Sequence, residues 1–142
     1  MNRELTTRKF VAVLNEKIPV GVLMNALGHM AAGIVGGASS LEEMRFDSYF
    51  DKDGGEHRSI SDCPFIILKA ENSSQIRRLR QEFASAEIKF VDFTSTMTVG
   101  TYFEQKERTR GTAEKDLEYY GICAFGEIEK IGQFTKRYSL WK

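Results

Sequence analysis

Residues able to act as acids, bases or hydrogen-bond donors lie at the end of a short apolar segment in the second half of the chain and directly after it. Asp92 lies near the end of the segment EIKFVDF, and Thr94, Thr96 and Thr98 follow it closely. A carboxylate at the carboxyl edge of an α/β sheet can orient a water molecule or accept its proton, and hydroxyls beside it can polarise a carbonyl group. An aspartate that caps the next helical segment gives the same pattern. The sequence leaves both interpretations open.

A second group of polar residues lies in the long apolar stretch 17–37. Lys17 and Gly21 stand at its start, where a lysine can hold an anion or pair with Asp92, and where free N–H groups of a helix N-terminus can receive an anion. Asn25 and His29 are four residues apart, which places them on one face of a helix. His29 can contact a ligand there. Alternatively, its ring is buried and hydrogen-bonded to the backbone, or lies at a subunit contact.

The elements that must position these groups alternate between strand and helix patterns. Short apolar runs predict strands over 9–17, 64–70, 87–93 and 119–127. Apolar spacings of three and four predict a helix that starts at Pro19, a second that is capped by Asn72 or Ser73, and a short third over 127–134. Strands that alternate with helices imply an α/β fold. We predict a single domain over 1–142, a three-layer sandwich with a mixed, mainly parallel four-stranded sheet.

Two segments fit this alternation poorly and are predicted to be insertions. Residues 38–62 contain the sequence DKDGGE, which is typical of a hairpin tip, and residues 100–117 are polar and mixed.

The helix that starts at Pro19 has one face made almost entirely of small residues, which recur at three and four: Gly21, Asn25, Gly28, Ala32 and Gly36. Glycine weakens a helix by about 1 kcal/mol relative to alanine, so this face suggests that something approaches the backbone closely. A neighbouring helix, the sheet or a second subunit could each be the element that packs against this face.

Composition limits the classes of function. The 142 residues include 20 Lys and Arg against 20 Asp and Glu, and this balance disfavours a dedicated nucleic-acid binder. The N-terminus lacks the layout of a signal peptide, and glycines and polar residues interrupt the apolar stretch, so we predict a cytoplasmic protein with no membrane span. Cys63 and Cys123 stand in no metal or redox spacing and are predicted to be buried free thiols.

The sequence predicts no metal site and no cofactor. Its only histidines, His29 and His57, lie in different segments, and a metal site would need further ligands at workable spacing. No P-loop, dinucleotide fingerprint or Gly-x-Ser-x-Gly nucleophile motif occurs.

The order of these motifs resembles the type II peptidyl-tRNA hydrolase family. That family has a lysine- and glycine-bearing turn after its first strand, and the stretch KIPVGV…GHMAAG matches it through Lys17, Gly21 and His29. Asp92 and Thr96 match a later aspartate and the threonine four residues after it. The strand ending AFGE and the tail TKRYSLWK resemble the closing part of the family. The resemblance implies the α/β fold of that family and hydrolysis of an ester bond.

Departures from the family pattern change the function that the resemblance implies. Val20 and Val22 stand where the family has further lysines, and Ala26 replaces a glutamine. Phosphate contacts supply most of the affinity for nucleic acid, so the loss of two cations disfavours tRNA as a partner. The chain therefore resembles an uncharacterised domain family related to this hydrolase more than the enzyme itself.

We expect a pocket for a small anionic or carbonyl ligand, which the protein binds or whose ester or amide bond it hydrolyses. Lys17, Asp92 and Thr96 are the expected catalytic residues. The ligand-binding residues are expected to be Gly21, Asn25, His29, Thr94 and Thr98.

Two other functions stay open. One is a non-catalytic binding module that forms a homodimer through the small-residue helix face. The other is a true peptidyl-tRNA hydrolase with substitute cations such as Arg77 or Lys106.

Overall fold

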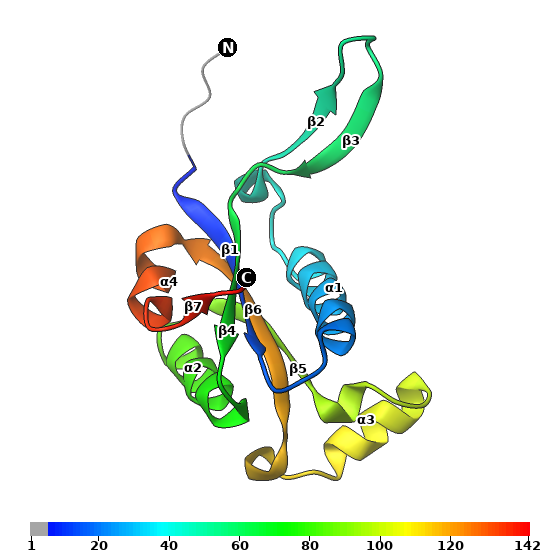
Figure 1. Ribbon diagram of the computed structural model, residues 1–142, viewed down its shortest axis with the longest axis vertical. Coiled ribbons are helices and arrows are strands. Elements are labelled where there is room, and N and C mark those ends of the chain that lie inside the picture. The colour runs from blue at the N-terminus through cyan, green and yellow to red at the C-terminus, as the bar shows by residue number, and fades with distance from the viewer. Residues whose placement is uncertain (1–5) are drawn as a thin grey trace.

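A five-stranded sheet in the order β5–β6–β1–β4–β7 forms the centre of the protein (Figure 1). The computed structural model describes residues 6–142. The strands of the sheet are β1 (Arg8–Asn15), β4 (Phe65–Ala70), β5 (Lys89–Thr94), β6 (Tyr119–Glu127) and β7 (Ser139–Leu140). Among the strands of residues 6–142 that form this sheet, only β1 and β4 pair in parallel, and the other three pairs are antiparallel. The predicted α/β fold is confirmed, whereas the predicted four-stranded, mainly parallel sheet is wrong.

The route of the chain between β5 and β6 explains the antiparallel pairing. This connection contains α3 (Tyr102–Arg110), which lies beyond the end of the sheet and covers neither face (Figure 1). β6 therefore enters the sheet at the end where β5 leaves it, and runs antiparallel to both β5 and β1. A helix that crossed a face would instead have made the strands parallel. The additional strand, β7, has two residues, too few to show an alternating pattern.

Helices cover both faces of the sheet. α1 (Val20–Gly36) packs over β6 and β5 and buries the side chains of Leu23, Ala26, Met30 and Ile34. α2 (Ser73–Ser85) and α4 (Ile128–Thr135) pack on the opposite face, where Ile76, Leu79, Phe83 and Ile131 join a second apolar cluster. The Asn72 side chain caps α2, since its Oδ1 accepts from the N–H of Gln75 at 3.0 Å. All three helices occur where the sequence predicts them.

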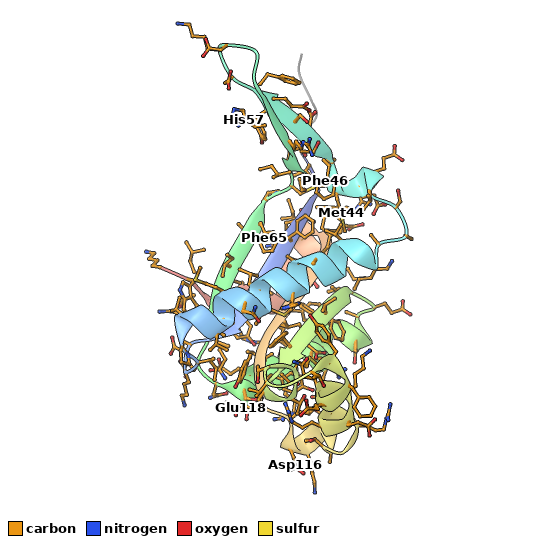
Figure 2. The ribbon with its side chains drawn as sticks, turned by 90° about the vertical axis from the view of Figure 1, so that its right-hand side faces the viewer. Met44, Phe46, His57, Phe65, Asp116 and Glu118 are labelled. Atoms are coloured by element: carbon orange, nitrogen blue, oxygen red, sulfur yellow. The ribbon has the colours of Figure 1, made fainter. Side chains whose placement is uncertain are left out.

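A separate antiparallel hairpin projects from the end of the molecule opposite α3 (Figure 1). It consists of β2 (Phe46–Phe50) and β3 (Glu56–Ser61), with the expected tip at 51–55, and we call residues 46–61 the arm. Figure 2 shows Met44 and Phe46 at its root and His57 farther out. The root is held firmly, because Met44 and Cys63 are buried and Arg45 forms an ion pair with Asp62 at 3.1 Å.

Both cysteines are buried free thiols, as the sequence predicts. Burial raises the pKa of the Cys123 thiol to about 12, so this thiol stays protonated and unreactive at neutral pH. Within residues 6–142, no helix has the length and apolar character needed to cross a bilayer.

Candidate functional site

A groove of about 1100 Å³ lies between α1, the end of β5 and α3. We call it the α1–α3 groove. Four of the eight site residues expected from the sequence line it, namely Asn25, His29, Asp92 and Thr98. Its apolar lining comes from β5 and the segments around it, and includes Met30, Val91, Phe93, Met97 and Tyr102. The groove is large enough for a small-molecule ligand.

α1 supplies the polar groups of one wall. Asn25 and His29 are both exposed, and the His29 ring stacks on Phe93 with 6.0 Å between the ring centroids. Within residues 6–142, neither side chain forms a hydrogen bond, so the amide of Asn25 and both ring nitrogens of His29 can meet a ligand. The alternative of a buried His29 bonded to the backbone is therefore wrong. The spacing of four residues does place the pair on one face.

α3 supplies the opposite wall, of which the sequence indicated only Lys106. Its groove-lining residues are Tyr102, Gln105, Lys106, Thr109 and Arg110. Thr101 and Glu104 form a capping box at the start of the helix, a pattern of threonine followed three residues later by glutamate that is visible in the sequence. Two neighbouring aromatic residues, Tyr102 and Phe103, at the start of an otherwise polar helix were a second signal in the sequence, and the structure shows them 71% and 73% exposed.

Threonine hydroxyls fasten α3 to the end of β5. Thr94 and Thr96 are buried, and their Oγ1 atoms lie 2.6 Å apart. The Oγ1 of Thr109 lies 2.8 Å from that of Thr96, and the Arg108 guanidinium donates to the carbonyl of Thr96 at 3.1 Å. Thr94 and Thr96 thus position a wall of the groove and do not line it. Thr98 does line it, although its hydroxyl donates to the carbonyl of Ser95 at 2.7 Å.

The carboxylate of Asp92 forms its contact on the face of the sheet that α2 covers, away from α1. It accepts a hydrogen bond from Nε of Arg80 at 2.7 Å, and this bond raises the pKa of the Arg80 guanidinium. Arg80 belongs to α2, whereas the neighbours of Asp92 along the strand, Val91 and Phe93, pack toward α1. Successive side chains of a strand point to opposite faces, so Asp92 borders the groove without directing its carboxylate toward α1.

Lys17 and Gly21 lie outside the groove. Lys17 is exposed in the turn after β1, where its backbone N–H donates to Oδ1 of Asn15 at 3.0 Å. Gly21 is exposed in the first turn of α1, and a Cβ added to it would meet nothing within 4 Å. The structure therefore brings Asn25, His29 and Thr98 together around one groove. It does not gather Lys17, Asp92 and Thr96 into one pocket.

Arg77, the other possible substitute for the missing lysines, forms its contacts outside the groove. Its Nε donates to Oε2 of Glu114 at 3.0 Å, and its guanidinium donates to the carbonyl of Leu117 at 2.5 Å. The Tyr119 hydroxyl donates to the same Glu114 oxygen at 2.8 Å. Burial and this bond raise the pKa of Tyr119 to about 12. These contacts fasten the segment before β6 to α2, so Arg77 is not available to the groove.

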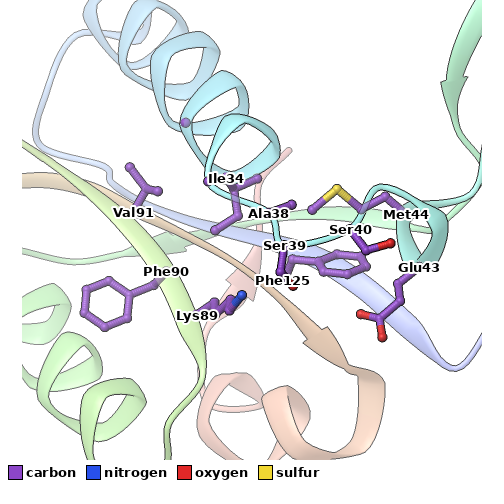
Figure 3. A pocket seen from close by; sticks show the side chains of 12 residues that line it. Ile34, Ala38, Ser39, Ser40, Glu43, Met44, Lys89, Phe90, Val91 and Phe125 are labelled. Atoms are coloured by element: carbon purple, nitrogen blue, oxygen red, sulfur yellow. The ribbon is translucent and has the colours of Figure 1, made fainter.

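A second, smaller cavity of about 270 Å³ lies beside the C-terminal end of α1 (Figure 3). Its lining is mainly apolar, with Ile34, Met44 and Phe125 inside and the charged residues Glu43 and Lys89 at its border. The volume is just below the range of about 300–1,000 Å³ that is usual for ligand pockets. The lining has neither a histidine nor an amide side chain. The α1–α3 groove is therefore the better candidate for a functional site.

Comparison with known proteins supports the fold and gives no activity. The solved structure of a protein of unknown function, Atu0240 from Agrobacterium tumefaciens strain C58, aligns with a TM-score of 0.82 and 16% sequence identity, over 97% of this chain and 100% of that one. At this identity the likeness shows the fold alone. No curated protein matches the chain significantly. A family model matches residues 8–142, and the chain therefore belongs to the family described as "Protein of unknown function (DUF2000)".

Proposed function

We propose that the α1–α3 groove binds a small ligand with an apolar part and an anionic or carbonyl group. This proposal rests on the pair Asn25 and His29. Both side chains are exposed and form no hydrogen bond within residues 6–142, and the apolar lining of the groove separates them from the cationic wall that α3 forms. Met97 and Tyr102 offer apolar surface to the ligand body. Asn25 and His29 can donate hydrogen bonds to a carbonyl oxygen.

The α3 wall would hold an anionic group. Lys106 is exposed and has no ion-pair partner within residues 6–142, whereas Arg110 pairs with Glu107 at 2.5 Å. Lys106 is thus the cation that a ligand can recruit without breaking another contact. The formal charge of the whole chain is zero, so attraction of an anion to the groove depends on such local cations.

If the groove also catalyses hydrolysis, His29 is a better base than Asp92. The imidazole of His29 would take a proton from water as the water oxygen bonds to the ligand carbonyl carbon, and would return that proton to the leaving group. The Asn25 amide would donate to the carbonyl oxygen. Asp92 cannot easily serve, because its carboxylate already bonds to Arg80 on the other side of the sheet.

The binding proposal can be tested with 8-anilino-1-naphthalenesulfonate, an aromatic sulfonate that fluoresces in apolar sites. We expect Lys106→Ala to weaken its binding about fivefold, since one exposed charge contact contributes about 1 kcal/mol. His29→Ala should also weaken it through loss of ring contact. Lys115→Ala, which changes an exposed lysine outside the groove, is the matched control. Equal binding by all four proteins would contradict the proposal.

Hydrolysis of peptidyl-tRNA is a second candidate function for the groove, which one observation favours and another opposes. Lys106 and Arg110 place two cations at the groove, although the turn before α1 has lost those expected at Val20 and Val22. We expect no ester release from an N-acetyl-aminoacyl-tRNA above the uncatalysed rate, because two exposed cations cannot replace an extended basic surface. Release that disappears in His29→Ala would instead assign hydrolase activity to the groove.

A further inference from the structure

We propose that the arm of one copy lies along α1 of a second copy, so that two chains form a symmetric dimer with exchanged arms. This inference does not depend on a ligand in the α1–α3 groove. It rests on three properties: apolar side chains on both faces of the arm, an outer face of α1 without charge, and the comparable lengths and complementary charges of the two.

Large apolar side chains occupy both faces of the arm. The strand register, with its extra residue in β3, places Phe46 and Phe50 on one face of the arm and Tyr49 and Ile60 on the other. Tyr49, Phe50 and Ile60 are 55%, 68% and 60% exposed. A two-stranded hairpin alone in water is marginally stable. An arm of this kind, with a root fixed in the core, is suited to pack against another molecule.

The outer face of α1 has the character of a buried surface although it is exposed. None of the 17 residues of α1 is charged, whereas a helix on the surface of a soluble domain normally presents charged residues to water. Gly21, Met24, Gly28 and Ala32 are exposed on this face. A Cβ at Gly21 or Gly28 would meet nothing within 4 Å, so packing within the chain does not require these glycines. They leave room for another backbone to approach closely.

The arm and α1 have comparable lengths. From Phe46 to Lys52, at the tip of the hairpin, the arm spans six residue steps, or about 20 Å at about 3.3 Å each. The 17 residues of α1 span about 25 Å. The arm starts just beyond the C-terminal end of α1 and points away from its own α1 (Figure 1). A two-fold axis near the arm root therefore lays each arm along the other chain's α1, from its C-terminal to its N-terminal end.

Charge complementarity supports this direction. The tip and its border, residues 51–56, contain Asp51, Asp53 and Glu56 against one cation, Lys52. The N-terminal end of α1, where the tip would arrive, has no acidic residue in its first turn and no side-chain cap. Lys17 lies next to it, exposed and without an ion-pair partner within residues 6–142. The positive end of a helix dipole and a lysine together favour an acidic partner.

Light scattering coupled to size exclusion tests the dimer with two variants that each remove one half of the contact. The unmodified chain should have twice the 16.2 kDa chain mass. The arm variant, Phe50→Asp with Ile60→Asp, and the α1 variant, Gly28→Arg, should each have the mass of one chain. All three positions are exposed, so far-UV circular dichroism should show an unchanged fold. Phe103→Asp, at a residue 73% exposed on α3, is the matched control and should stay dimeric.

Mixing the two variants separates this arrangement from other dimers. The α1 variant keeps an unchanged arm, and the arm variant keeps an unchanged α1. The mixture should therefore associate through one contact between an unchanged arm and an unchanged α1, although neither variant associates alone. A mixture that keeps the mass of one chain would overturn the pairing of arm with α1. A dimeric α1 variant would show contact between arms and overturn it as well. A monomeric unmodified chain would overturn the proposal directly.

Discussion

Gly121→Val should lower the free energy of unfolding by about 3 kcal/mol, because β6 passes directly beneath α1 at this residue. A Cβ at Gly121 would lie 2.8 Å from Cδ2 of Leu14, 2.9 Å from Cε of Met30 and 3.3 Å from the carbonyl oxygen of Val13. Leu14 and Met30 are buried, so their side chains have little space into which to move. Urea unfolding followed by circular dichroism measures the loss.

The same substitution should also disturb the α1–α3 groove. We expect α1 to lift from the sheet when a larger residue occupies position 121, and to carry Asn25 and His29 with it. We expect weaker binding of the fluorescent sulfonate by the part of Gly121→Val that remains folded. Gly132→Ala, in α4, is the control: its Cβ would meet nothing within 4 Å, so it should raise stability by up to about 1 kcal/mol. A Gly121→Val protein of normal stability would contradict close packing of α1 on β6.

Asp92→Ala should lower the free energy of unfolding by about 1–2 kcal/mol and leave binding in the groove unchanged. The ion pair between Asp92 and Arg80 is only partly shielded from water, since their side chains are 17% and 37% exposed. The cost of removing one partner is therefore larger than for a surface pair and smaller than the about 3–5 kcal/mol expected for a fully buried pair. Removal of the carboxylate leaves the Arg80 guanidinium over the Phe90 ring, at 5.4 Å from its centroid, without its anion.

A double-mutant cycle with Arg80→Ala isolates the pair. The double variant should be more stable than the sum of the single losses predicts, by about 1 kcal/mol. Asp116→Ala, which removes an exposed carboxylate, should change stability by less than about 0.5 kcal/mol. If Asp92→Ala instead keeps normal stability and loses binding of the sulfonate, Asp92 acts in the site as the strand-end motif suggests.

The elements of the fold were predictable wherever a period of two or 3.6 residues runs through them. α2 is the clearest case, because Ile76, Leu79 and Phe83 mark its buried face and Asn72 marks its start. The order and direction of the strands were not predictable. They depend on the path of the segment between β5 and β6, which is polar, buries no side chain in α3 and has no period from which to place it.

The site was predictable in part for the same reason. The spacing of Asn25 and His29 determines that they share a face, and the structure places both in the groove. Alternation along β5 also places the side chain of Asp92 on the face opposite those of Val91 and Phe93. Only the structure shows that Arg80 lies on that face and binds the carboxylate. The wall that faces His29 depends on contacts of α3 with the end of β5, and no local pattern encodes them.

α3 has consequences for the motions of the molecule. None of its nine residues is buried, and Arg108 and Thr109 hold it to the end of β5 through hydrogen bonds. A segment with no apolar anchor opens at a lower free energy than the whole chain, as a separate cooperative unit. The two walls of the groove, α1 and α3, would then be in equilibrium between a closed form, in which α3 is docked, and an open form, in which it is not. A ligand that contacts both walls would shift this equilibrium toward the closed form, and its affinity would include the free energy of that shift.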